Sequence, residues 1–299
     1  MRHDPLATDV SRTIALGIGA TLTLLACEDP RLVANLGAEV SPRLVLPGER
    51  TECFDVTGAL LFERASIIAP RLDPSLAHHV ALHRASRAPI DRDCTSIGPA
   101  TLLYMGSPGD DPLVVPDDHA LVLTHDADDV LVLELHYVNA TAAPREDTSG
   151  LDLVSAPASA SHEIGLWTVG DPVLDIPART RGHVEEKRCT IRTDRPVVLH
   201  AVSPHMHARG VAISVTRTRG ERDEPIVEVD PFDPLRQRTV TLERALALEP
   251  GDRLTLRCVY DNPDAFDVTY GTRLEDEMCF AYVWASPIEA LRDDASFCH

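Results

Sequence analysis

The chain has 299 residues, which is enough for one large domain or two medium-sized ones. Hydrophobic residues make up 44% of it and aromatic residues only 4%, so a core would be built from aliphatic side chains rather than rings. The formal net charge of -19 would repel a phosphate backbone. We therefore expect no nucleic-acid partner.

The first residues have the layout of a signal peptide. Arg2 and Arg12 precede an apolar run at 14–26, which is short for a membrane span. The run ends in Leu-Leu-Ala-Cys27, which resembles the cleavage box of bacterial lipoproteins, in which Cys27 would be acylated and become the new N-terminus. We expect residues 1–27 to be a signal peptide with this lipobox, and the mature protein to be an exported bacterial lipoprotein, periplasmic or at the cell surface. The alternative is an apolar segment that happens to end in cysteine.

Six cysteines remain once Cys27 is set aside: Cys53, Cys94, Cys189, Cys258, Cys279 and Cys298. An even number in an exported chain predicts three disulfides. The spacing alone leaves their connectivity open.

The rest of the chain has a strand pattern. Short β-branched and Leu-rich runs, such as 130–138 and 253–260, alternate with Pro, Gly and Asp clusters. Helical periodicity is weak, and 23 Pro and 16 Gly interrupt most candidate helices. This predicts an all-β protein with two tandem antiparallel β-sandwich domains, jelly-roll-like, joined by a short linker.

The small-residue stretch around 155–161 suits a connector between these domains. The predicted organisation is an N-terminal linker at 28–50, a first domain at 51–155, a linker at 156–161 and a second domain at 162–299.

Three groups stand out among the 13 histidines: the adjacent pair His78 and His79, His136 in a Leu-rich run, and His205 with His207. Residues two apart share one face of a strand, so His205 and His207 can approach one metal ion. His78 and His79 would point to opposite faces of a regular strand, so joint ligation needs a bend or bulge. Taken singly, the paired histidines could be a solvated surface patch, and His136 could be a hydrogen-bonded residue at a domain contact.

The order of the motifs is more specific than any one of them. Leu133-Glu-Leu-His-Tyr137 is followed by His205-Met-His-Ala-Arg-Gly210 and then by Asp276-Glu-Met-Cys-Phe-Ala-Tyr282. From Glu52 onward the chain resembles the copper type II, ascorbate-dependent monooxygenases, the family of the peptidylglycine α-hydroxylating and dopamine β-hydroxylating enzymes. The resemblance covers nearly the whole mature chain.

The resemblance implies two copper ions at two mononuclear sites that face a cleft between the domains. The electron-transfer copper would be bound by His78, His79 and His136, and the oxygen-activating copper by His205, His207 and Met278. A thioether ligand favours Cu(I), the state that meets O2. The disulfides that the resemblance implies are Cys53–Cys94, Cys189–Cys298 and Cys258–Cys279.

The implied activity is hydroxylation of a C–H bond of a small organic substrate with O2 and a one-electron reductant such as ascorbate. Tyr282 matches the family's substrate-site tyrosine and is the predicted catalytic residue, with strand packing as the alternative. The peptide-amidating members carry Arg and Asn where this chain has Ser203 and Phe280. A C-terminal glycine substrate is therefore not expected.

Other readings of the pattern stay open. The chain could be a non-catalytic copper-binding or electron-transfer lipoprotein, or a sandwich protein whose histidines bind nothing. We expect a monomer. Glu134, two residues before His136, could tune the first copper or be solvated, and we expect the latter. His83 and His200 are expected to support the ligand groups or to be incidental.

Overall fold

The computed structural model describes residues 31–299, apart from 87–89, 95–99, 171, 292–296 and 299. The expected signal peptide and Cys27 lie outside the described residues. Residues 31–299 form one compact unit. No helix in this described part is long and apolar enough to cross a membrane.

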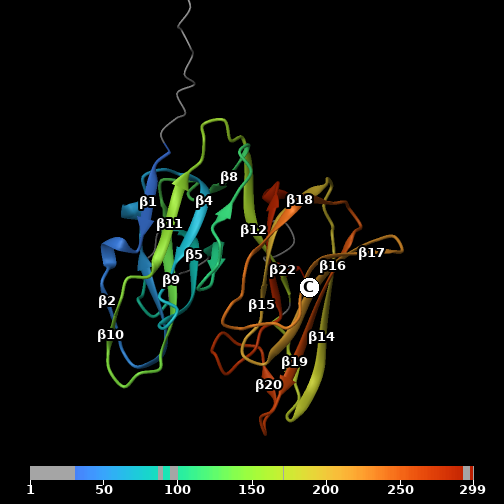
Figure 1. Ribbon diagram of the computed structural model, residues 1–299. Helices are drawn as coiled ribbons and strands as arrows, with labels where there is room; N and C mark the ends of the chain where they lie inside the picture. Colours follow the sequence, from blue (N-terminus) through green and yellow to red (C-terminus); the bar gives the residue numbers. More distant parts are fainter. Residues whose placement is uncertain (1–30, 87–89, 95–99, 171, 292–296, 299) are drawn as a thin grey trace, which may run out of the picture. The chain divides into compact units, whose positions relative to one another are not determined.

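The described residues form strands and three short 3₁₀ helices, with no α-helix among them, which confirms the predicted all-β class (Figure 1). The strands are β1 (Val33–Leu36), β2 (Arg43–Val45), β3 (Gly48–Asp55), β4 (Arg64–Arg71), β5 (Ala77–Ser86), β6 (Ala100–Gly106), β7 (Leu113–Val114), β8 (His119–Val122), β9 (Asp129–Asn139), β10 (Arg145–Asp147), β11 (Gly150–Ser155), β12 (His162–Gly170), β13 (Asp175–Ile176), β14 (Thr180–Thr190), β15 (Val197–His205), β16 (Gly210–Arg219), β17 (Arg222–Val229), β18 (Val240–Leu248), β19 (Arg253–Asn262), β20 (Val268–Thr269), β21 (Phe280–Ser286) and β22 (Phe297–Cys298). The 3₁₀ helices are η1 (Ala38–Val40), η2 (Thr57–Ala59) and η3 (Ile288–Leu291).

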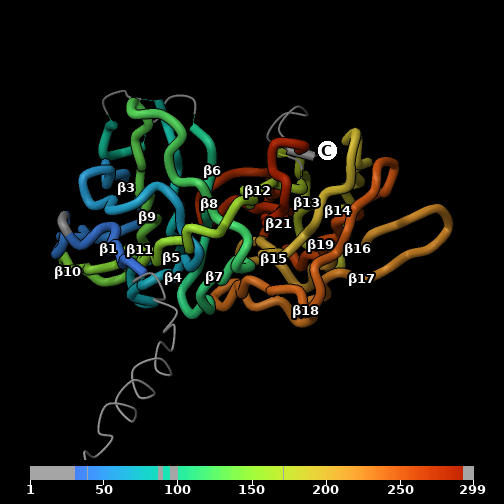
Figure 2. The backbone as a smooth tube through the Cα atoms, turned by 90° about the horizontal axis from the view of Figure 1, so that it is seen from above, coloured from blue at the N-terminus to red at the C-terminus, as the bar shows by residue number. Residues whose placement is uncertain are grey.

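One long sheet runs through both halves of this unit in the order β1-β11-β4-β8-β12-β21-β15-β18. Strands β8 and β12 join the halves, because His162–Ile164 pair in parallel with His119–Leu121 (Figure 2). Two four-stranded sheets complete the sandwiches: β3-β9-β5-β6 in the first half and β14-β19-β16-β17 in the second.

Two buried clusters of apolar side chains fill the sandwiches, and β21 serves both. Alternate residues of a strand point to opposite faces. Phe280, Tyr282 and Trp284 therefore pack into the first cluster, whereas Ala281 and Val283 pack into the second. Every residue of β21 is buried as a result.

The segment at 28–50, expected to be a linker, contributes strands instead. From residue 31 onward it forms β1, β2 and the start of β3, and β1 pairs with β11. Leu36 and Val45 are fully buried in the first cluster. These strands were missed because runs of three or four residues are too short to show a period. The predicted linker at 156–161 falls between β11 and β12, and its role as a domain boundary stays a prediction.

Two of the three expected disulfides are confirmed, Cys53–Cys94 and Cys258–Cys279. Cys189 is also disulfide-bonded. The side chain of Cys298 lies outside the described residues, so its pairing with Cys189 stays a prediction.

Candidate metal centre

The first histidine group comes from two paired strands of the first sandwich. His79 on β5 lies opposite His136 on β9, and the register shifts between Ala77 and His79. This irregularity lets the adjacent pair reach the same side, as a bulge would in any strand. Potential ligand atoms of His78, His79 and His136 all lie within 4.8 Å of one another.

Two nitrogens of this group are buried without hydrogen-bond partners. They are the Nδ1 atoms of His79 and His136, which contact no donor or acceptor among the described residues. The Nε2 atom of His136 lies 2.8 Å from Oε1 of Glu49 on β3. Since a carboxylate can only accept, a neutral His136 carries its proton on Nε2 and leaves the Nδ1 lone pair free. A buried lone pair with no donor is what a metal ion satisfies.

Burial also keeps the rings of His78 and His136 neutral. It lowers the pKa of His78 to about 3, helped by the neighbouring His79. It lowers the pKa of His136 to about 4, and the carboxylate of Glu49 only partly opposes this. Neutral imidazole is the form that binds transition metals.

The second group lies where β15 ends. His205 is the last residue of the strand and His207 follows two positions later, with ring centroids 5.3 Å apart. Both rings are buried, and burial lowers the pKa of each. The Nδ1–H of His207 donates to the backbone oxygen of Asp276 at 3.0 Å, which leaves Nε2 as its free lone pair.

Glu277 connects this group to Met278. Its carboxylate accepts backbone N–H bonds from His207 at 2.9 Å, Arg209 at 2.7 Å and Met278 at 3.3 Å. Burial raises the pKa of Glu277 to about 7, although the three N–H donors favour the charged form. Sequence reasoning missed this residue, although it directly precedes Met278 in a motif already singled out.

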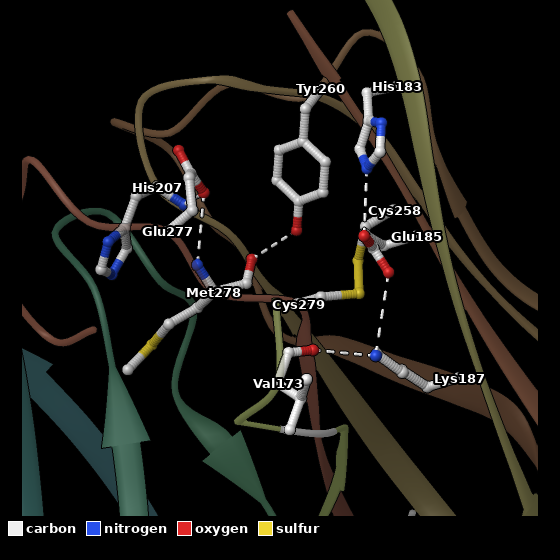
Figure 3. Close-up of a disulfide and its surroundings, with 10 residues drawn as sticks. All are labelled: Val173, His183, Glu185, Lys187, His207, Cys258, Tyr260, Glu277, Met278 and Cys279. Carbon is white, nitrogen blue, oxygen red and sulfur yellow. Dashed lines mark hydrogen bonds and ion pairs between the residues drawn. A yellow bond between two sulfur atoms is a disulfide. The ribbon is translucent and has the colours of Figure 1, made fainter. Parts of the chain in front are cut away.

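Met278 itself is held by two further contacts. The hydroxyl of Tyr260 donates to its backbone oxygen at 2.7 Å, and the next residue, Cys279, is bonded to Cys258. The side chains of His207 and Met278 both extend away from this disulfide (Figure 3). The backbone of Met278 is therefore fixed on both sides.

The two histidine groups meet. Ring centroids of His78 and His207 are 6.3 Å apart, and those of His79 and His205 are 6.5 Å apart. We call these residues, with His136, the five-histidine cluster. The two groups therefore lie side by side as one continuous cluster, and the expectation of two mononuclear copper sites facing a cleft stays a prediction.

Glu134 is not solvated, contrary to expectation. Its carboxylate lies 3.0 Å from Nε2 of His83 and 3.7 Å from Nε2 of His79. Burial opposes ionisation, but the hydrogen bonds from His79 and His83 hold the pKa of Glu134 below its usual range. Glu134 and His83 thus support the cluster from the side.

His200 lies elsewhere. Its Nε2 contacts Oγ of Ser286 at 2.7 Å, and its ring lies 4.9 Å from that of His119. His119 in turn stacks near His162, with centroids 5.2 Å apart. His200 therefore belongs to a separate group and not to the five-histidine cluster.

Tyr282 lies at the edge of the cluster. It pairs with Ser203 on β15, and its ring centroid is 5.8 Å from that of His205. Its side chain is buried and burial raises the pKa of its hydroxyl, so the group stays a hydrogen-bond donor at neutral pH. Tyr282 and Met278 both line a cavity of about 540 Å³.

Residues 163–292 match the family model described as copper type II ascorbate-dependent monooxygenase, C-terminal domain. Dopamine beta-hydroxylase from Bos taurus is 28% identical over 169 residues, which are 52% of this chain and 28% of that protein. Putative DBH-like monooxygenase protein 2 from Homo sapiens is 24% identical over 235 residues, 70% of this chain and 47% of that protein. The chain thus spans less than half the length of either relative.

Among solved structures, the major capsid protein P2 of bacteriophage PM2 is 12% identical with a TM-score of 0.33, covering 85% of this chain and 96% of that one. PNGase F of Flavobacterium meningosepticum is 9% identical with a TM-score of 0.38, covering 86% and 95%. Likeness at this level does not bear on function.

Proposed function

We propose that the chain is a copper type II ascorbate-dependent monooxygenase, the family whose C-terminal domain is matched by residues 163–292, and that it hydroxylates a C–H bond of a small organic molecule with O2 and a one-electron reductant such as ascorbate. The observation that carries the proposal is the five-histidine cluster, in which two buried Nδ1 atoms lack any partner among the described residues. Burying such an atom costs free energy unless it coordinates a metal ion or accepts a hydrogen bond.

We assign the ligands of two copper ions within this cluster. His78, His79 and His136 would hold the electron-transfer copper, and His205, His207 and Met278 the oxygen-activating copper. Imidazole suits both oxidation states of copper, whereas a thioether favours Cu(I). The donor set therefore fits a metal that cycles between the two states.

Bound copper would supply one-electron transfer and the activation of O2. The protein's own groups prepare the ligands: Glu49 holds His136 in the tautomer with a free Nδ1, and the backbone oxygen of Asp276 holds His207 in the tautomer with a free Nε2. Burial of the rings of His79, His136, His205 and His207 limits the access of bulk water to the centre, which would protect a reactive oxygen species and favour reaction with an oriented substrate. Tyr282 would position the substrate beside His205.

We further propose an oxidising location for the protein. The disulfides Cys53–Cys94 and Cys258–Cys279 support export, because such bonds persist outside the reducing cytoplasm. Together with the lipobox-like sequence that ends at Cys27, this favours a bacterial lipoprotein, periplasmic or at the cell surface.

The first experiment measures copper content by mass spectrometry and ascorbate-driven O2 uptake on the reconstituted protein. We expect two copper ions per chain and O2 uptake that His205→Ala and Met278→Ala abolish without a change in circular dichroism. His183→Ala on β14, outside the five-histidine cluster, is the control and should keep wild-type uptake. A mixture of copper and ascorbate without the protein gives the background uptake by free copper. Two bound copper ions without uptake above that background would indicate a copper carrier instead.

A further inference from the structure

The cavity beside Met278 has the size of a small-molecule site. Its volume of about 540 Å³ falls within the range of about 300–1,000 Å³ that ligand pockets usually have. Its walls come from both halves of the unit: β5, β6 and β8 on one side, and β12, β21 and η3 on the other. The continuous sheet holds these walls together through the β8–β12 pairing.

The cavity adjoins the metal centre at two points. Met278, the proposed thioether ligand, forms part of its wall, and so does Tyr282, whose ring lies 5.8 Å from that of His205. A molecule in the cavity would therefore lie next to the group proposed to activate O2.

The walls are mainly apolar. Leu102, Leu103, Leu121, Leu166 and Phe280 are among the lining residues. Not one Lys or Arg occurs among the described residues that line the cavity, so a carboxylate or phosphate inside it would have no cationic partner. Burying an unpaired charge costs far more than burying a neutral polar group.

The two groups in the wall that could recognise a charged substrate are already engaged. Nε2 of His83 lies 3.0 Å from Glu134, and Glu163 lies 3.5 Å from Nε2 of His125. A substrate ammonium group would have to compete with these contacts. Uncharged groups have open partners in the hydroxyls of Thr168 and Tyr282.

We propose that this cavity is the substrate site and that it selects uncharged, hydrocarbon-rich molecules with at most a single neutral polar group. This inference rests on the proposed function, which it deepens by naming the substrate class. It separates the chain from enzymes that anchor a substrate carboxylate, since the cavity's described lining lacks the cation that such an anchor needs.

The test is a binding series on one skeleton, measured with the copper-reconstituted protein by isothermal titration calorimetry. The probes are butylbenzene, 4-phenyl-1-butanol, 4-phenylbutylamine and 4-phenylbutyrate. We expect the two neutral probes to bind at least tenfold more tightly than either ion. Binding of the carboxylate as tight as that of butylbenzene would overturn the proposal.

Variants locate the binding. Leu102→Trp and Leu166→Trp each fill the cavity from a different wall and should weaken butylbenzene binding at least tenfold, with copper content unchanged. Leu235→Trp, at a residue 74% exposed, is the matched control. Thr101→Arg places a cation at the cavity wall and should increase the affinity for 4-phenylbutyrate. Unchanged butylbenzene binding in both filling variants would contradict the assignment.

The series separates the two proposals. Neutral probes that bind in the cavity but are not hydroxylated by the loaded protein with ascorbate and O2 count against the monooxygenase proposal and leave the binding inference in place. Hydroxylation of the carboxylate in preference to the neutral probes supports a monooxygenase and overturns the substrate class.

Discussion

Glu277 accepts a hydrogen bond from the backbone N–H of His207, with its Oε2 2.9 Å from that nitrogen. The same oxygen lies 3.3 Å from the backbone nitrogen of Met278. One buried carboxylate thus fixes the backbone of two proposed ligands that are 71 positions apart in the chain. The other oxygen, Oε1, accepts from the backbone N–H of Arg209 at 2.7 Å, and because backbone N–H groups can only donate, both carboxylate oxygens must act as acceptors.

Replacing Glu277 should loosen the second copper site selectively. In Glu277→Gln one acceptor oxygen becomes an amide NH₂ that faces N–H donors. We expect copper affinity at this site to fall about 10- to 100-fold, the usual effect of losing a group that orients a ligand, while the first site keeps its affinity. Copper titration followed by electron paramagnetic resonance measures both.

Glu275→Gln is the control for this prediction, because the side chain of Glu275 is exposed and pairs only with Arg273 among the contacts described, while its backbone bond to Arg209 is unaffected by the change. A Glu277→Gln protein with wild-type affinity at both sites would show that the carboxylate does not position the ligands.

Glu49 should play the matching role for the first site. Glu49→Ala removes the acceptor of the His136 Nε2–H, so the ring can turn and place its Nδ1 lone pair elsewhere. We expect about a 10- to 100-fold loss of copper affinity at the first site. Glu49→Gln retains an acceptor oxygen and should restore most of the affinity. If it fails to do so, an acceptor oxygen at this position is not sufficient to hold His136 for copper binding.

The Cys258–Cys279 disulfide should matter for both stability and metal binding. The bond closes a loop of 21 residues, so replacing both cysteines with Ala should lower the free energy of unfolding by about 3 kcal/mol in denaturant titrations. It should also reduce copper at the Met278 site, since Cys279 is the next residue. The Cys53→Ala/Cys94→Ala protein opens a loop of 41 residues and should lose about 4 kcal/mol while keeping copper at that site.

The metal-free protein should become less stable as the pH is lowered, and His200 should contribute to this loss. Burial, and then the neighbouring His119, lowers the pKa of His200 from 6.5 to about 4. Between these values the unfolded chain binds the proton and the folded chain does not, so stability falls as pH drops from about 6.5 to about 4.

His200→Gln tests this contribution. The free energy of unfolding is measured by urea titration at several pH values with a chelator present. In the variant, its slope against pH should be lower by at most one proton's worth, or about 1.4 kcal/mol per pH unit. A variant with the wild-type slope over this range would rule out His200 as a source of the pH dependence.

The sequence predicts what depends on short-range periodicity. The alternation at 130–138 predicts strand β9, and the spacing of His205 and His207 predicts that they approach one another. Contacts that depend on which residues pair across neighbouring strands cannot be predicted in this way. Glu49 reaches His136 across 87 positions because Thr51 pairs with His136 and Glu49 lies two residues along the same face, which no local pattern reveals.

The approach of the two histidine groups was equally hidden, since it follows from how one sandwich packs on the end of β15. Glu277 is an intermediate case. Its position next to Met278 was visible in the sequence. That its carboxylate accepts from the backbone N–H of His207 depends on the turn that brings His207 beside it.

Strand β21 contributes to both cores, so we expect the two halves to fold as one cooperative unit and not as interchangeable modules. The family match begins at residue 163, inside the β8–β12 pairing. A fragment cut there would lose the first core and expose the rings of Phe280, Tyr282 and Trp284 to water. An exposed apolar face of this kind promotes aggregation. A recombination event that replaces one half of the protein must therefore supply a surface that fits β21. Substitutions in the two halves are constrained by this shared strand.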